Sequence, residues 1–255
     1  IDAVKRYFFW DLETTGLSKV KGDVQIKQFG AIEADIDLCF QDSVNIKSKC
    51  LEYITPQPGA LLTTRNTDFL YEGQSENEMA IDIFKAFEEC KAKGFTLNVQ
   101  YNGQRFDEPI LQTTLDRNLC SPYVTSMDGG SKCDMFTIVK LLATGYPEYN
   151  FPRNKKGNFS LGLAIVSSFL GLKSEDAHDA LADSRMTLGI ARHLKEEKPE
   201  LFHAALVHGT KQGSLNMIRH SEDYMFSGKV NYGKEDRTPE VFCGQGNTRD
   251  TANIV

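Results

Sequence analysis

The sequence predicts an α/β fold in residues 1–203, followed by the start of a small β-rich unit in residues 204–255. Near the N-terminus, segments with strand character are joined by short connections. Farther along, several segments have apolar residues at helical spacing, and one further short segment has strand character. Beyond His208 the sequence changes to Gly-punctuated β signals, which are too few to close a barrel or a sandwich.

Length and composition are those of a globular protein with one large domain, or with one large and one small domain. The chain has 255 residues, of which 40% are hydrophobic and 25% are charged. A formal net charge of −6 excludes nucleic-acid binding by bulk positive charge, although cations held in a site would still permit such a substrate. No apolar stretch is long enough to span a membrane, and no signal peptide is visible. The six cysteines form no CxxC pair, so we expect a protein of the reducing cytoplasm.

The first strand is predicted from the unbroken aromatic run Tyr7–Trp10, which indicates burial on both faces. Asp11 and Glu13 follow at once and, because they are two residues apart, project from the same face. Two ionised acids at the end of a buried strand repel each other and lose water, which a bound cation can offset. Hard divalent cations such as Mg²⁺ prefer these oxygen ligands. The alternative is an ordinary strand end at which acids meet solvent.

The remaining elements follow in order along the chain. Residues 25–35 and 42–49 are predicted to be strands of an antiparallel meander, and residues 55–59 form a turn-rich break. Residues 76–93 have helical periodicity, and residues 95–101 form another short strand. Further helices are expected after Asp107 and at residues 134–146, 161–170, 179–197 and 199–208, and residues 153–158 form a basic loop.

Asp107 begins a helix that carries Ile110, Leu111 and Leu115. Counted at helical spacing, Asp107 falls on the same stripe as these apolar residues. An acid followed by Glu and Pro109 is also typical of an N-cap with proline in the first turn. The N-cap role and a role in a functional site are compatible.

Asp183 lies on the inward face of the helix that Asp179 is expected to cap. An acid on an inward face needs a partner. His178 immediately precedes the first turn, near Asp183, although a packed or surface histidine is the alternative interpretation. The residues that share the face with Asp183 are Thr187, Ile190, Ala191 and Leu194.

Together, the four acids and the histidine resemble the DEDDh exonucleases. The three motifs of that superfamily are Asp-x-Glu after an apolar strand, Asn-x-x-x-Phe-Asp, and His-x-Ala-x-x-Asp. They are matched in order by Asp11–Glu13, Asn102–Asp107 and His178–Asp183. Within the superfamily, the sequence between the motifs is most similar to the bacterial exonuclease I family, and this similarity extends over nearly all of residues 7–205.

The resemblance implies a ribonuclease H-like fold, in which a mixed five-stranded sheet is flanked by helices. It also implies two divalent cations, Mg²⁺ or Mn²⁺. Asp11 would bridge the two cations, Glu13 and Asp183 would hold the first, Asp107 would support the second, and His178 would be the general base. The reaction would be stepwise release of nucleoside 5′-monophosphates from the 3′ end of single-stranded DNA, in DNA repair and recombination.

Substrate contacts are also implied by the resemblance. A stacking aromatic residue and a phosphate-binding cation suit a groove that accepts single strands of any sequence. Gln112 and Ser160 stand where relatives have arginine, so the strand is held more loosely or by other residues, such as Arg153, Lys155 and Lys156. The candidate substrate-binding residues are Glu13, Thr14, Leu17, Phe106, Tyr123, Lys140 and Ser160.

Two other functions remain open at this point. Thr15 makes the first motif similar to that of proofreading exonucleases, so a proofreading or oligoribonucleotide exonuclease is the first alternative. A non-catalytic nucleic-acid-binding module is the second, although its expected signature, loss of an acid, is absent. We expect a monomer that binds single-stranded DNA and no membrane, with single-strand DNA-binding protein as a further candidate partner.

Overall fold

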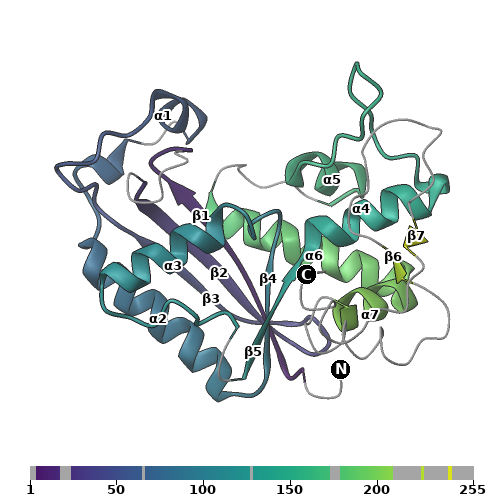
Figure 1. The fold of residues 1–255 in the computed structure, drawn as a ribbon, viewed down its shortest axis with the longest axis horizontal. Helices are drawn as coiled ribbons and strands as arrows, with labels where there is room; N and C mark the ends of the chain where they lie inside the picture. The colour runs from purple at the N-terminus through teal and green to yellow at the C-terminus, as the bar shows by residue number, and fades with distance from the viewer. Residues whose placement is uncertain are drawn as a thin grey trace.

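The centre of the protein is a mixed five-stranded sheet with strand order β3-β2-β1-β4-β5 (Figure 1). The strands are β1 (Arg6–Thr14), β2 (Ile26–Asp35), β3 (Phe40–Lys47), β4 (Thr96–Gln100) and β5 (Gly130–Asp134). The first three form the predicted antiparallel meander, whereas β4 and β5 run parallel to β1. The computed structural model describes residues 4–17, 24–64, 67–126, 129–172 and 179–208, with two short strands at 225–226 and 241–242.

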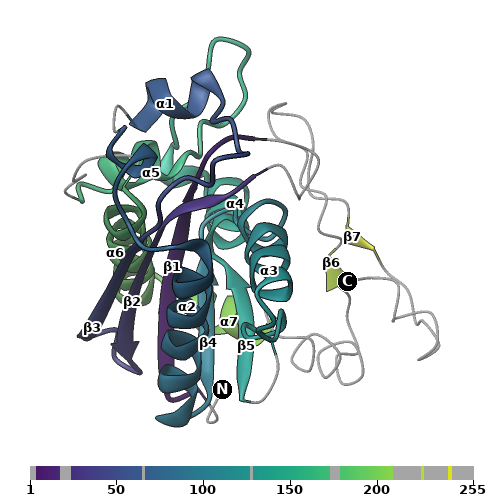
Figure 2. The same ribbon diagram turned by 90° about the vertical axis from the view of Figure 1, so that its left-hand side faces the viewer.

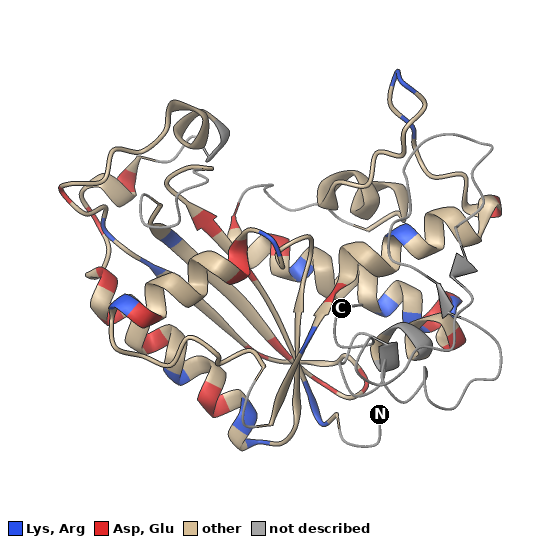
Figure 3. Ribbon diagram, viewed as in Figure 1, with Lys and Arg blue, Asp and Glu red and all other residues tan. Residues whose placement is uncertain are grey.

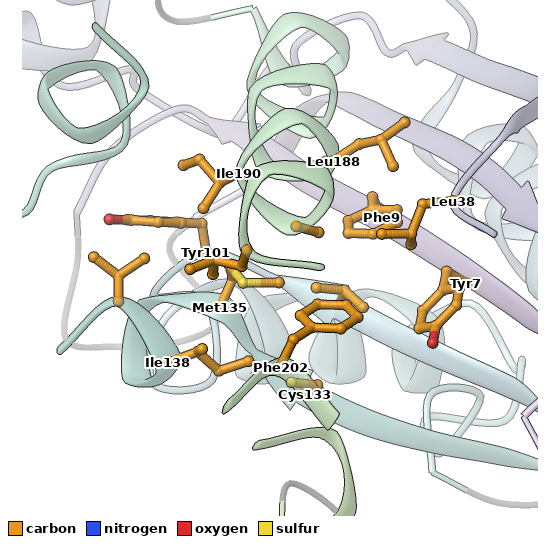
Figure 4. Close-up of a cluster of buried hydrophobic side chains, with 14 of the residues drawn as sticks. Tyr7, Phe9, Leu38, Tyr101, Cys133, Met135, Ile138, Leu188, Ile190 and Phe202 are labelled. Carbon is orange, nitrogen blue, oxygen red and sulfur yellow. The ribbon is translucent and has the colours of Figure 1, made fainter. Parts of the chain in front are cut away.

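Strand β1 lies in the middle of the sheet and is buried on both faces, as predicted. Phe8 and Trp10 point into one core, where each ring packs edge-on against Phe87. Tyr7 and Phe9 point into the other core, which Figure 4 shows in close-up. Because burial of one such side chain contributes about 1.5–3 kcal/mol, the aromatic run fixes the position of β1 and of whatever follows it.

Helices cover the two faces of the sheet as separate layers (Figures 1 and 2). The helices on the Phe8 face are α2 (Glu76–Ala92) and α3 (Asp107–Arg117). Those on the Phe9 side are α4 (Met135–Gly145), α5 (Leu163–Phe169), α6 (Ala180–Glu197) and α7 (Pro199–His208). The shorter elements are α1 (Pro58–Thr64), η2 (Asp68–Leu70) and η3 (Pro147–Tyr149).

Helix α6 packs directly on the backbone of β2 at Gly30. A Cβ atom at Gly30 would lie 2.2 Å from the Leu181 nitrogen and 2.3 Å from the Ala180 carbonyl carbon, so only glycine permits this approach. The Ser184 hydroxyl donates a 2.9 Å hydrogen bond to the Gly30 carbonyl oxygen. The first turn of α6 is therefore fixed against the strand next to β1.

Two elements differ from the sequence-based expectation. Strand β5 was not anticipated, because its Gly, Ser and Lys residues have little strand preference and Cys133 is its one buried residue. Its pairing with β4 stabilises it nonetheless. Residues 55–59 were expected to be a break, yet α1 begins at Pro58, a residue that suits the first position of a helix.

The β-rich tail is described only in part. β6 (Met225–Phe226) and β7 (Val241–Phe242) pair in antiparallel register, and the rest of the predicted unit lies outside the described residues. Helix α7 ends at His208, as predicted, and the domain division at residue 204 remains a prediction. In the part of the chain that the structure describes, no helix combines the length and the hydropathy that crossing a bilayer requires.

Candidate active site

Asp11 and Glu13 lie at the C-terminal end of β1, and Asp183 joins them from the first turns of α6. One carboxylate oxygen from each of the three residues lies within 4.8 Å of those of the other two. In the register between β1 and β2, Asp11 is paired with Gly30. The close packing of α6 on Gly30 therefore also places Asp183 near Asp11.

Asp107 reaches the same region from the start of α3. Phe106 occupies the N-cap position without a side-chain cap hydrogen bond, and Asp107 is the first helical residue, so the predicted N-cap role of Asp107 is wrong. Its carboxylate is turned toward Gly103, where an added Cβ would lie 2.8 Å from Asp107 Oδ2. Only 9% of Asp107 is exposed. Glycine at position 103 thus leaves room for a buried acid.

The four carboxylates form one electrostatic cluster with an excess of negative charge. Burial, together with the charges of Asp107 and Asp183, raises the pKa of Asp11 well above its usual range. Burial and the charge of Glu13 raise the pKa of Asp107 to about 8. Burial likewise raises the pKa of Glu13 to about 7, although Lys27 opposes this rise. A cation bound among these acids would stabilise their ionised forms.

Lys27 is a charged neighbour of this cluster that the sequence analysis missed. Glu13 pairs with Gln28 and Thr14 pairs with Ile26, so Lys27 is the extra residue of a β-bulge. Its Nζ lies 3.7 Å from Glu13 Oε2, and its side chain is 7% exposed. Lys27 could have been identified from the sequence as the single lysine of the predicted strand at residues 25–35.

Asp179 caps α6 as predicted. Its side chain accepts hydrogen bonds of 3.1 Å from the backbone nitrogens of Leu181 and Ala182. Gln28 Nε2 donates a further 2.8 Å bond to Asp179 Oδ2, which ties the cap to β2. His178, the preceding residue, lies outside the described residues, so its role as a base remains a prediction.

A cleft of about 530 Å³ opens beside the acids and contains aromatic side chains. Aromatic faces beside an acidic cluster suit a ligand that has both bases and phosphates. The residues that line the cleft include Asp11, Asp183, Tyr101, Phe136, Asn158 and Phe159.

Hydrogen bonds fix the side of the cleft formed by the loop after β4. The Tyr101 hydroxyl donates a 2.6 Å bond to the Leu161 carbonyl oxygen, and its ring centroid lies 5.5 Å from that of Phe136. Asp134 Oδ1 accepts bonds of 2.7 Å from the Asn102 nitrogen and 3.0 Å from the Phe136 nitrogen. The loop and the start of α4 are therefore held together by one carboxylate.

Three predicted substrate residues, Thr14, Leu17 and Phe106, are not among the residues that line the cleft. The Thr14 hydroxyl is buried and donates a 2.9 Å bond to the Gly16 carbonyl oxygen. Leu17 is 77% exposed, and its nitrogen donates a 2.9 Å bond to Gln57 Oε1. Phe106 packs against the core on the α2 and α3 side of the sheet. Of the three, Leu17 is the most exposed, Phe106 is partly exposed and Thr14 is buried.

The remaining predicted substrate residues adjoin the cleft or lie at the surface. Lys140 Nζ lies 4.2 Å from the centroid of Phe136, a cleft-lining ring. Ser160 is the neighbour in sequence of Phe159, which also lines the cleft. Tyr123 is 53% exposed. The sequence-based prediction thus included neighbours of the cleft but did not include Phe136 and Phe159, whose rings line it.

Comparison with known proteins agrees with the resemblance and the fold. Exodeoxyribonuclease I of Escherichia coli strain K12 is 29% identical over 218 residues, which cover 83% of this chain and 44% of that protein. The crystal structure of E. coli exonuclease I with a dA16 oligonucleotide has a TM-score of 0.75 and 26% identity, over 84% of this chain and 45% of that chain. A zinc-bound complex of the same enzyme with single-stranded DNA has a TM-score of 0.75 and 25% identity, over the same shares of the two chains. This chain thus spans less than half the length of these relatives.

The family model described as Exonuclease (RNase_T) matches residues 8–191. The matched region runs from β1 into α6 and includes all four acids of the cluster, on the mixed sheet that the resemblance implied. The chain therefore belongs to the RNase_T exonuclease family.

Proposed function

We propose that this chain degrades single-stranded DNA from its 3′ end and releases nucleoside 5′-monophosphates by phosphodiester hydrolysis with two divalent cations, in DNA repair and recombination. The main support is the convergence of Asp11, Glu13 and Asp183 within 4.8 Å, with Asp107 coupled to them by charge. Membership of an exonuclease family supports the reaction class. The matched E. coli enzyme was crystallised with a DNA strand, which supports the substrate class.

The residues of the cluster fit hard divalent cations. All four donors are carboxylates, which Mg²⁺ and Mn²⁺ favour, and burial together with neighbouring acids raises the pKa values of Asp11, Glu13 and Asp107. Asp11, which responds to the charges of the other three, would bridge two cations. Glu13 and Asp183 would hold one cation, and Asp107 would support the other. When bound, such a pair supplies an activated water and a stabilised leaving oxygen.

The chain itself would supply a base and a place for the strand. A histidine that titrates near pH 6.5 can accept a proton from the attacking water at neutral pH, and His178 is the candidate in motif position. The partly exposed rings of Phe136 and Phe159 offer faces on which nucleotide bases can stack without regard to sequence. Lys140, beside Phe136, offers a cation for a phosphate.

A degradation time course tests the proposal. With Mg²⁺, a 3′-labelled DNA strand should lose its label at once as a mononucleotide, while a 5′-labelled strand should shorten step by step. Chelator should stop both reactions. Release of the 5′ label first, or undiminished cleavage in chelator, would overturn the proposal. Parallel RNA strands test the oligoribonucleotide alternative, because the 2′-hydroxyl distinguishes the substrates.

A pair of variants ties the activity to the acid cluster. Asp11→Asn should abolish release of nucleotides and weaken Mg²⁺ binding measured by calorimetry, because it removes a central negative charge. Asp116→Asn is the matched control, since Asp116 is an exposed acid on α3. Equal activity of the two variants would show that hydrolysis does not depend on the cluster.

A further inference from the structure

The basic loop predicted at residues 153–158 is an ordered hairpin, here called the basic hairpin (residues 152–160). Arg153 and Phe159 form an antiparallel bridge across it. Within the bridge, the Asn154 nitrogen donates a 2.8 Å hydrogen bond to the Asn158 carbonyl oxygen. In Figure 1 the segment between η3 and α5 projects away from the sheet. Its own hydrogen bonds therefore hold the projecting segment in one conformation.

One leg of the basic hairpin is a wall of the cleft. Asn158 and Phe159 line the cleft together with Asp11 and Asp183. The guanidinium carbon of Arg153, on the opposite leg, lies 3.9 Å from the centroid of the Phe159 ring. A cation is thus fixed directly behind an aromatic face of the cleft.

The hairpin concentrates positive charge in a chain whose net charge is −6. Arg153, Lys155 and Lys156 are all exposed, and residues 152–160 contain no acid. Among the ion pairs of the described residues, none involves these three side chains. In Figure 3 the ribbon of the loop that rises above α5 is coloured blue, the colour of Lys and Arg, near its tip. Within the described part of the chain, no acid competes with a phosphate for these cations.

We propose that the basic hairpin binds backbone phosphates of single-stranded DNA upstream of the nucleotide held at the acid cluster. This inference rests on the function proposed for the cleft. Lys155 and Lys156 lie in the turn at the tip of the hairpin, and Lys156 is three residues before the cleft-lining Phe159 in the sequence, a separation of at most about 10 Å. The lysines therefore reach phosphates outside the cleft, and a substrate of two or three nucleotides is too short to contact them. Contacts to phosphate carry no sequence information, as a strand of any sequence requires.

The test is the salt dependence of strand binding by the double variant Lys155→Gln/Lys156→Gln. Binding of a strand of about 20 nucleotides is measured in EDTA, so that no hydrolysis follows. Each lost phosphate contact lowers the slope of log affinity against log salt by about 0.7, so the slope should fall by about 1.4. Affinity at about 50 mM salt should fall at least about tenfold. With Mg²⁺, turnover of a trinucleotide should not change.

A control of equal charge separates a local contact from a general loss of positive charge. Lys85→Gln/Lys195→Gln removes two lysines that pair with Asp82 at 3.4 Å and Asp37 at 3.1 Å. Lys195 is 12 residues along α6 from Asp183, about 18 Å from the acid cluster. This variant should keep the wild-type slope within about half a unit.

The outcomes distinguish the two proposals. An unchanged slope in the hairpin variant, or an equal fall in the control variant, would overturn the hairpin proposal even if the wild type degrades DNA. If the wild type releases no nucleotide but the slope still falls in the hairpin variant alone, the exonuclease proposal fails, whereas phosphate binding by the hairpin is supported. The variant Lys155→Arg/Lys156→Arg keeps both positive charges, so its slope should equal that of the wild type. Unchanged melting temperatures verify that every variant is folded.

Discussion

The metal-free protein should lose stability as the pH rises from about 5 to about 8, because of the acid cluster. In the fold, burial and neighbouring charge raise the pKa of Glu13 to about 7 and that of Asp107 to about 8. In the unfolded chain the same groups have their ordinary values of 4.5 and 3.8. Between these limits the folded protein holds protons that the unfolded chain has released, so a rise in pH favours unfolding. Asp11 acts in the same direction.

The size of the effect follows from the raised pKa values of Glu13 and Asp107. Each group contributes about 1.4 kcal/mol per pH unit while its protonation differs between the two states. From about pH 5.5 to 7, two groups give an upper limit of about 4 kcal/mol, and solvent screening lowers this to about 2–4 kcal/mol. For a protein of this size, 1 kcal/mol shifts the melting temperature by about 2–4 °C. In EDTA, we therefore expect the melting temperature to fall by about 5–15 °C as the pH rises from about 5.5 to 7.

Scanning calorimetry across this pH range, in EDTA and in saturating Mg²⁺, is the assay. Bound cations take the place of protons, so stabilisation by Mg²⁺ should grow as the pH rises. Asp107→Asn should reduce the pH slope in EDTA by about 1.4 kcal/mol per unit, whereas the exposed-acid control Asp116→Asn should not. A stabilisation by Mg²⁺, relative to EDTA, that does not change with pH would refute the reasoning. So would an Asp107→Asn variant whose stability in EDTA depends on pH as steeply as that of the wild type.

Three further substitutions test separate parts of the site. Gly30→Ala should lower the melting temperature and reduce nucleotide release at least tenfold, because its Cβ would meet the Leu181 backbone, whereas Gly59→Ala, with no atom nearby, should change neither. Lys27→Met should destabilise the metal-free protein by about 3 kcal/mol through loss of a buried ion-pair partner, and calorimetry with Mg²⁺ should show a smaller loss. His178→Ala should slow hydrolysis by about 10²–10⁴-fold while calorimetric Mg²⁺ binding persists, and near-normal turnover at neutral pH would remove it from the mechanism.

The acids of the site could be predicted because the sequence shows both their chemistry and their surroundings. Asp11 follows an aromatic run that has to be buried, so Asp11 lies at the edge of a core. Asp183 shares a helix face with Ile190, Ala191 and Leu194, all of which are buried. Hydrophobic periodicity is a local property, and it therefore locates the acids without knowledge of the tertiary structure.

Other features depend on more than one segment, and the sequence did not reveal them. The place of Lys27 is set by a bulge, which is a property of the register between β1 and β2. Strand β5 exists through its pairing with β4. The start of α3 at Asp107 depends on the backbone of Phe106, which a residue pattern alone does not specify.

The glycines show how the geometry of the site is separated from its chemistry. Gly30 lets α6 approach the sheet and so sets the position of Asp183, while Gly103 leaves room for the carboxylate of Asp107. Neither glycine has a functional group, and yet each determines where an acid lies. Replacement of an acid removes a charge, whereas replacement of a glycine leaves every charge in place and changes distances. A glycine variant that keeps all four acids but loses cooperative binding of divalent cations would show that spacing, and not acid content, makes the cluster a site.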